Sequence, residues 1–143
     1  MALIREVKAE KTLMGRLSYG ADLLEELTDI CADRNIRLGR VEALGAVQKA
    51  RIEYYDQKKR EYAFKEMDEP LEILKLSGNV SVKENAPMIH AHITLADREG
   101  NAYGGHLAPG TVVFACEFLI ESFEGEELIR SFDEETDLTL WKQ

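Results

Sequence analysis

All three histidines of the chain, His90, His92 and His106, lie within a window of seventeen residues. His90 and His92 are two residues apart in an apolar run that is typical of a β-strand. Because side chains at positions i and i+2 of a strand point to the same face, both imidazoles should face one side. Three neutral imidazoles suit a divalent transition metal, zinc first, and leave a fourth coordination position open. The spacing predicts a metal site and does not name a reaction.

The segment between His92 and His106 predicts how the third ring returns to the other two. Residues 97–101 read Asp-Arg-Glu-Gly-Asn, a tight turn, and residues 103–107 then come back antiparallel. Paired strands lie about 5 Å apart, which is within reach of a shared ion. Gly104 and Gly105 remove side chains where the backbone must pass close to something.

A metal-bound imidazole usually donates its second N–H to a carboxylate or a carbonyl, so carboxylates near the histidines in the sequence are possible partners. Asp97, Glu99 and Glu117 are the candidates. Glu117 is a carboxylate in the middle of an apolar strand, between Ala115 and Leu119. One interpretation is a solvent-facing position at a sheet edge. The other is a catalytic one, in which Glu117 supports a ligand or acts as a general base on metal-bound water.

Composition limits the classes of partner. The 143 residues carry 18 Lys and Arg against 27 Asp and Glu, a net charge of −9. This disfavours DNA and anionic membranes, whose binding relies on Lys and Arg. Cys31 and Cys116 are expected to be buried, reduced thiols. With no signal-peptide pattern or membrane-length apolar run, we expect a cytoplasmic protein.

Hydrophobic periodicity predicts one principal helix among many strands. Asp22 is a good N-cap, the apolar positions that follow have helical spacing, and Asn35 is a plausible left-handed stop. The expected strands cover residues 3–8, 37–47, 49–55, 61–67, 71–82, 86–96, 103–107, 111–123, 128–133 and 138–141, with the strand at 128–133 turning back onto the one before it. We therefore predict a single domain over residues 1–143 of the α+β class, a mostly antiparallel sheet with one principal helix packed on it.

Three stretches together resemble a known family. The first runs from Gly15 through Tyr19-Gly20 to Leu24, and the second is Leu71-Glu-Ile-Leu-Lys-Leu-Ser-Gly-Asn-Val-Ser81. The third is the His-x-His…Gly-Gly-His pattern followed by Glu117. They are similar to the plants and prokaryotes conserved (PPC) domain in its prokaryotic stand-alone form. The resemblance covers nearly the whole chain.

The resemblance implies further expectations. It implies an antiparallel sheet with a helix, a homotrimer, and a DNA-associated role, although this acidic chain has no Arg-Gly-Arg-Pro hook. A more distant similarity to acetolactate decarboxylase and to ester hydrolases with a three-histidine zinc centre would map His90, His92 and His106 onto metal ligands. Arg16, Arg40 and Glu42 are other charged residues whose place relative to that metal is open.

Two functions remain open from the sequence, besides direct DNA binding, which would require a basic stripe on the assembled trimer. One is a metal-binding homotrimer in which the ion is structural or regulatory. The other is a zinc-dependent lyase or hydrolase that acts on a small carbonyl or ester substrate. A cavity beside the metal would favour the enzyme, and a sealed site would favour a structural ion.

Overall fold

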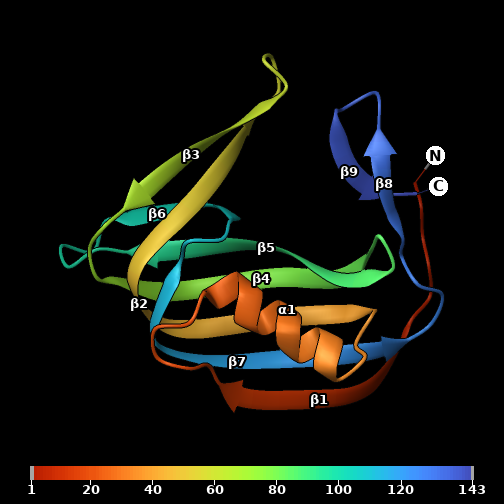
Figure 1. The fold of residues 1–143 in the computed structure, drawn as a ribbon, viewed down its shortest axis with the longest axis horizontal. Coiled ribbons are helices and arrows are strands. Elements are labelled where there is room, and N and C mark those ends of the chain that lie inside the picture. The colour runs from red at the N-terminus through yellow and green to blue at the C-terminus, as the bar shows by residue number, and fades with distance from the viewer. Residues whose placement is uncertain (1, 143) are drawn as a thin grey trace.

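The computed structural model describes residues 2–142, which form one mostly antiparallel sheet, one helix and a small second sheet (Figure 1). In chain order the elements are β1 (Lys8–Arg16), α1 (Leu23–Asp33), β2 (Gly39–Asp56), β3 (Glu61–Met67), β4 (Leu71–Lys83), β5 (Ala86–Ala96), β6 (Ala102–Leu107), β7 (Val112–Glu124), β8 (Arg130–Asp133) and β9 (Leu138–Trp141). The α+β prediction is confirmed.

Helix α1 begins and ends where the sequence predicts. The Asp22 carboxylate accepts the backbone N–H groups of Leu24 and Glu25, which satisfies two donors that the first turn leaves free. Asn35 follows the helix with a φ of 52°, in the left-handed region. Within residues 2–142, no helix has the length and apolar composition needed to cross a bilayer.

The main sheet has the strand order β1-β7-β2-β4-β5-β6, with β3 added beside β2. The helix covers one face of this sheet (Figure 1), and the core lies between them. Buried residues of the helix pack with those of the central strands: Leu23, Leu27, Cys31, Val41, Val47, Leu76, Val80, Ile93, Val113 and Ile120. Both cysteines are free and buried, as predicted. The opposite face, here called the outer face, carries no helix.

Strand β2 is one long bent strand, where the sequence predicted two. Its first half pairs with β4 and β7, and its second half pairs with β3 and β6. Gly45, at a φ of 139°, lies in the irregular stretch between the halves, where a Cβ would stand 2.1 Å from the carbonyl oxygen of Ala115. Because β2 contacts both β4 and β6, the strands β2, β4, β5 and β6 close on themselves.

Two predictions about strands are wrong, one in the position of a strand and one in its pairing. Residues 3–7 form no strand, since β1 pairs with β7 only as far as Lys8 and Glu124, where β7 ends. Strand β8 does not return onto β7, because β1 and β2 already occupy both edges of β7. It pairs instead with β9 in a separate two-stranded sheet. The sequence predicts a strand at the position of β9 but not this pairing.

Candidate metal centre and its cavity

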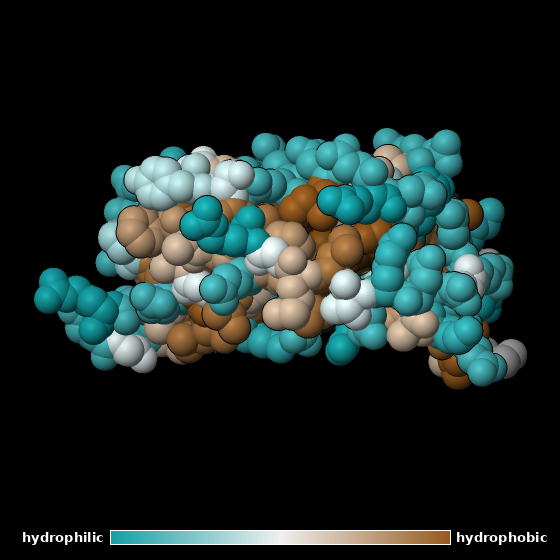
Figure 2. Space-filling model, turned by 90° about the horizontal axis from the view of Figure 1, so that it is seen from below, coloured by the Kyte–Doolittle hydropathy of each residue, from teal (hydrophilic) through white to brown (hydrophobic). Residues whose placement is uncertain are grey.

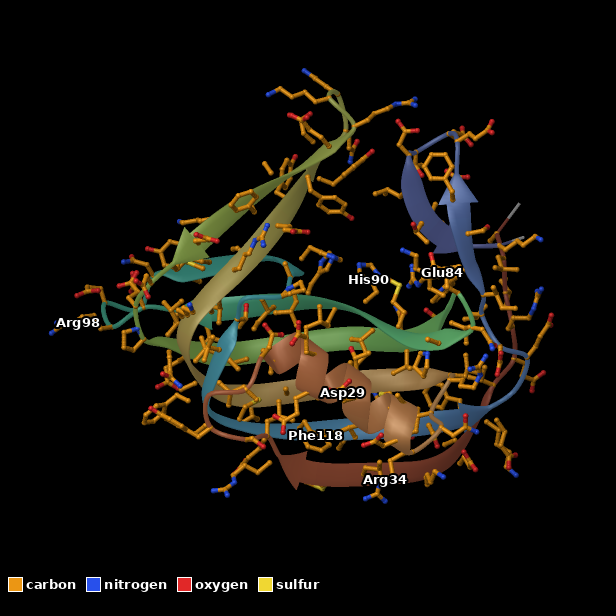
Figure 3. The ribbon with its side chains drawn as sticks, viewed as in Figure 1. Asp29, Arg34, Glu84, His90, Arg98 and Phe118 are labelled. Carbon is orange, nitrogen blue, oxygen red and sulfur yellow. The ribbon has the colours of Figure 1, made fainter. Side chains whose placement is uncertain are left out.

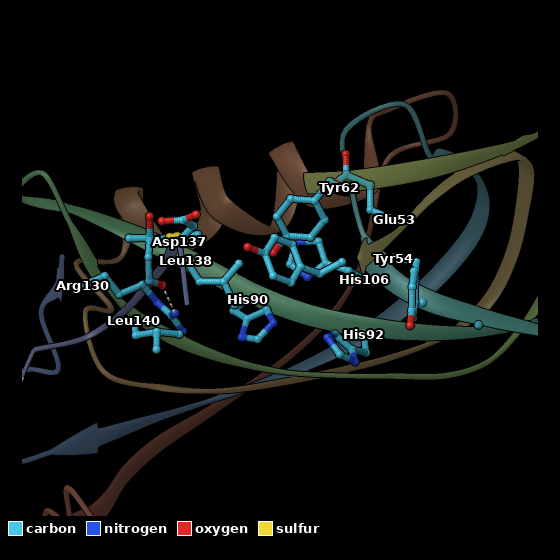
Figure 4. A pocket seen from close by; sticks show the side chains of 15 residues that line it. Glu53, Tyr54, Tyr62, His90, His92, His106, Arg130, Asp137, Leu138 and Leu140 are labelled. Carbon is cyan, nitrogen blue, oxygen red and sulfur yellow. Dashed lines mark hydrogen bonds between the residues drawn. The ribbon is translucent and has the colours of Figure 1, made fainter. Parts of the chain in front are cut away.

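The structure brings the three histidines together. His90 and His92 lie on β5 and His106 lies on β6, with His92 directly opposite His106 in the antiparallel register. The ring centroids are 5.0 Å apart for His90 and His106, 5.2 Å for His90 and His92, and 5.7 Å for His92 and His106. One possible ligand atom from each ring lies within 4.8 Å of the other two. The predicted convergence of the rings is therefore present (Figure 4).

The two glycines before His106 make room for this arrangement. Strand β6 passes between β5 and the second half of β2. A Cβ on Gly105 would stand 2.8 Å from the backbone oxygen of Glu53, and a Cβ on Gly104 would stand 3.2 Å from that of Ile93. The close approach predicted from the sequence is thus an approach of backbone to backbone. It lets β6 pair on both sides and holds His106 at the site.

The histidines line an open cavity of about 670 Å³ (Figure 4). Its walls come from β2 and β3, from the histidine strands, and from the β8–β9 hairpin. Polar and aromatic side chains dominate near the rings: Glu53, Tyr54, Tyr55, Tyr62, Arg130 and Asp137. His92 is exposed while His90 and His106 are half-buried, so a ligand can approach the group from solvent.

Burial keeps the rings in the form that binds metals. The pKa of His90 is lowered to about 4, mainly by partial burial and in addition by the neighbouring His106, Arg130 and His92. Burial also lowers the pKa of His106, and His92 adds to this effect, whereas Glu53 acts in the opposite direction. At neutral pH these two imidazoles are uncharged, and each offers a nitrogen lone pair.

Glu53 is a site residue that the sequence analysis missed. It stands opposite His106 in the β2–β6 pairing, so the two side chains are neighbours on one face. Its carboxylate is 3.8 Å from the Arg51 guanidinium. The only sequence signal for this contact is the Gly104-Gly105 pair, which indicates that another backbone comes close and not which one.

Arg130 is a second missed residue, and it lies in the cavity wall. Its Nε donates to Ser81 Oγ at 2.7 Å, its Nη2 donates to Asn79 Oδ1 at 3.0 Å, and its Nη1 donates to the carbonyl oxygen of Thr139 at 3.1 Å. Burial lowers the pKa of Arg130 and the phenol of Tyr62 opposes this, but an arginine stays charged at neutral pH. The guanidinium therefore places a fixed positive charge near the histidines.

Glu117 is not brought to the histidines. It is exposed on β7, which is separated from β5 by β2 and β4, and three strand spacings span about 14 Å. It lines a different, smaller depression of about 220 Å³ on the outer face, together with Met14, Glu42, Leu44, Leu74, Lys75 and Leu119. We call this depression the Glu117 hollow. Its position there does not support the catalytic role considered from the sequence.

The other candidate carboxylates also lie elsewhere. Asp97 organises the β5–β6 turn: it accepts the backbone N–H groups of Glu99 and Asn101 and the hydroxyl of Tyr103. These hydrogen bonds, led by those from Asn101, hold the pKa of Asp97 below its usual value. Glu99 pairs with Arg98 in the same turn.

The remaining charged candidates stay on the flat part of the sheet. Arg16 is opposite Glu117 in the β1–β7 register. Arg40 bonds Glu121 at 2.6 Å, and Glu42 bonds Lys75 at 3.0 Å. None of these side chains lines the histidine cavity.

The donor set fits a divalent transition metal. Metal–nitrogen bonds of about 2.1 Å put the nitrogens of a tetrahedral centre about 3.4 Å apart. The possible ligand atoms lie within 4.8 Å of one another, so the rings would have to move closer together to share one ion. His90, His92 and His106 would supply three ligands, and the cavity leaves room for a fourth. When bound, such an ion polarises an oxygen atom of a ligand.

The chain was compared with known proteins. Residues 4–124 match the description "Plants and Prokaryotes Conserved (PCC) domain". A metal-containing protein from Archaeoglobus fulgidus has 44% sequence identity and a TM-score of 0.95, covering 99% of this chain and 100% of its own. A plant- and prokaryote-conserved protein from Pyrococcus horikoshii has 28% identity and a TM-score of 0.93, covering 99% and 98% of the two chains.

Further similarities bear on the expectations from the sequence. A candidate DNA-binding protein from Ralstonia eutropha JMP134 has 25% identity and a TM-score of 0.80, covering 91% of this chain and 90% of its own. A Staphylococcus aureus protein described as similar to alpha-acetolactate decarboxylase shares only the fold, at 16% identity and a TM-score of 0.52, over 85% of this chain and 54% of its own.

One curated relative is much longer than this chain. The bifunctional protein GlmU of Synechococcus sp. (strain JA-2-3B'a(2-13)) is 34% identical over 100 residues. The match spans 69% of this chain and 15% of that protein.

Three observations point to the same family: the family match over residues 4–124, the fold shared over nearly the full length and the three-histidine pattern. The chain belongs to the Plants and Prokaryotes Conserved domain family, as its motifs predicted.

Proposed function

We propose that this protein binds a divalent transition metal, with zinc as the first candidate. His90, His92 and His106 would hold the ion. The observation that carries the proposal is the convergence of three possible ligand atoms within 4.8 Å of one another. The half-buried, neutral rings of His90 and His106 support it, because a protonated imidazole cannot ligate. The metal-containing relative from Archaeoglobus fulgidus, at 44% identity, supports it further.

Metal analysis of the purified protein tests this directly. After incubation with zinc and extensive dialysis, we expect one zinc per chain in the wild type and a large loss in the His92→Ala variant. Thr94→Ala is the matched control, because Thr94 is also exposed on β5, two residues from His92. Equal zinc content in wild type and His92→Ala would refute the site. Competition with nickel and cobalt would then rank the metals.

We also propose that the protein assembles as a homotrimer through the outer face. The family resemblance gives the number three. Support from the structure comes from the Glu117 hollow, where large apolar side chains are exposed: Met14 at 81%, Leu44 at 58% and Leu74 at 55%. Figure 2 views the molecule from the side of β1, the strand that carries Met14, and shows apolar atoms exposed among hydrophilic ones along this side. Burying such surface against another copy is favourable.

A second candidate function is a metal-dependent lyase or hydrolase for a small carbonyl or ester substrate. The cavity favours it, since a structural ion needs no open space, while this site opens onto about 670 Å³ with Tyr62, Glu53 and Arg130 in its walls. A screen of zinc-loaded protein with 2-keto acids and simple esters tests it. Turnover that disappears in His92→Ala would support an enzyme, and no turnover with any of them would favour binding alone.

A DNA-associated role is suggested by the relative from Ralstonia eutropha and opposed by the charge of this chain. A net charge of −9 works against contacts with phosphates. Figure 3 shows two of the arginines, Arg34 and Arg98, well apart, one near β1 below the helix and the other in the turn between β5 and β6. Gel-shift titration at several salt concentrations tests the role. Binding at low salt that weakens steeply as salt rises would support it, and no shift at low salt would exclude it.

A further inference from the structure

Arg130 is a buried cation without a carboxylate partner among residues 2–142. The residue is 9% exposed, and its three hydrogen-bond acceptors, on Ser81, Asn79 and Thr139, are all neutral. The ion pairs among residues 2–142, with nitrogen–oxygen distances up to 4.0 Å, all join residues other than Arg130. Buried charges in proteins are normally paired, because removing them from water is costly. This charge therefore needs an explanation.

A structural role explains the hydrogen bonds of Arg130 and leaves its charge unexplained. The side chain ties β8 to β4 through Ser81 and Asn79, and its guanidinium lies 5.6 Å from the ring centroid of Trp141. A neutral amide, with two N–H groups, could donate to two of these three oxygens without the cost of a buried charge. The guanidinium has five N–H groups, of which three donate in these bonds, so two stay available.

The charges in and beside the wall of the cavity that Arg130 lines, three arginines against two carboxylates, leave a surplus of one positive charge: Arg130, Arg51 and Arg60 against Glu53 and Asp137. Its two wall carboxylates each lie beside another arginine: Glu53 is 3.8 Å from Arg51, and Asp137 is 3.3 Å from Arg60. Figure 4 shows Arg130 at the side of the cavity nearer His90 than His92. A divalent ion on the histidines would add to the surplus. An anion that enters the cavity would meet attraction from both the ion and Arg130.

We propose that this cavity takes a small organic carboxylate, which binds beside the metal and pairs its charge with Arg130. A carboxylate presents two oxygens in a plane, and a guanidinium presents paired N–H groups in the same geometry. The inference rests on the metal site proposed above and names the class of ligand for it. Arg130 is the residue that selects the anion, while His90, His92 and His106 supply the metal.

The test is calorimetric titration of zinc-loaded protein with lactate and with lactamide. The two compounds have the same size and the same hydroxyl group and differ in charge. We expect lactate to bind wild type at least tenfold more tightly than lactamide. Arg130→Met should lower lactate affinity about tenfold and leave lactamide affinity unchanged. Arg98→Met is the matched control: it removes an arginine that is exposed in the β5–β6 turn, and should leave lactate affinity unchanged.

Zinc content, measured for each variant before titration, separates this inference from the metal proposal. If wild type holds no zinc, both fail. If it holds zinc but lactate and lactamide bind equally, or Arg130→Met binds lactate as wild type does, only the carboxylate inference fails. Tighter binding of inorganic phosphate than of lactate would also overturn it. Should Arg130→Met not fold, Arg130→Gln, which can still donate to Ser81 or Asn79, replaces it.

Discussion

Two depressions on the outer face of one sheet have opposite chemistry. His92, Ser77 and Glu42 form a row across β5, β4 and β2, so the histidine cavity and the Glu117 hollow share this face. The hollow lies on the flat strands β1, β7, β2 and β4, and its exposed surface is largely apolar. The cavity lies where the second half of β2, with β3, turns over β6, and its walls carry imidazoles, phenols and Arg130.

The difference shows that the bend of β2 makes the site. On the flat strands, neighbouring side chains point the same way and expose a largely apolar surface, which we propose packs against another copy of the chain. Where β2 leaves β4 and pairs with β6, residues far apart in the sequence face one another, as Glu53 and His106 do. A cavity with several kinds of polar group follows from that closure. The two regions should therefore respond separately to substitution.

The largest expected effect is loss of assembly on Leu44→Glu, in the Glu117 hollow. A carboxylate buried against another copy would lose its hydration without gaining a partner, so the interface should fail. We expect the mass in solution, measured by light scattering, to fall from three times 16.2 kDa to 16.2 kDa. Zinc content should stay unchanged. Ile4→Glu, another exposed apolar residue outside the hollow, is the control. A trimer in Leu44→Glu would contradict this use of the hollow.

The next effect concerns the glycines that let β6 fit. In Gly105→Ala the new Cβ would stand 2.8 Å from the backbone oxygen of Glu53, which cannot move aside easily. We expect the free energy of unfolding to fall by about 1–3 kcal/mol and zinc affinity to fall with it. Gly104→Ala is the matched control, since its nearest contact is 3.2 Å and it should lose less. Urea denaturation of both variants measures this, and equal losses would argue against the closure.

A smaller effect separates the two glutamates. Glu53→Gln removes a negative charge beside His106, and Glu117→Gln makes the same change in the hollow. Removing a group that supports a metal ligand costs about tenfold or more in metal affinity. We expect about a tenfold loss of zinc affinity in Glu53→Gln and none in Glu117→Gln, measured by competition with a chelating dye. A greater loss in Glu117→Gln would reverse the comparison between the two regions.

The sequence predicted those parts of the site that depend on neighbours along the chain. His90 and His92 share a face because a strand has a period of two, and His106 returns because the turn at Asp97–Asn101 is short. The contact between Glu53 and His106 joins residues 53 positions apart. It depends on a bend within β2, at a point where the sequence predicts a break between two strands. Alternation within a strand says which residues share a face and not which strands become neighbours. For that reason the sequence leaves both a solvent-facing and a catalytic interpretation open for Glu117, which shares a face with the histidines but lies in the other depression. For the same reason it does not identify Glu53.

The smallest expected effect concerns Asp97, which was considered as a partner of the histidines and instead holds the turn between them. Its folded-state pKa is lowered by hydrogen bonds from Asn101, Tyr103 and Glu99. The stabilisation is therefore present above the pKa of the unfolded state, about 3.9, and is lost as the pH falls through the lowered value. Asp97→Asn should lower the urea midpoint slightly at pH 7 and differ less from wild type at pH 3. Because Asp97 contacts no histidine, the zinc content of the Asp97→Asn variant at pH 7 should match that of wild type. A loss of zinc without a loss of stability would restore Asp97 to the metal site.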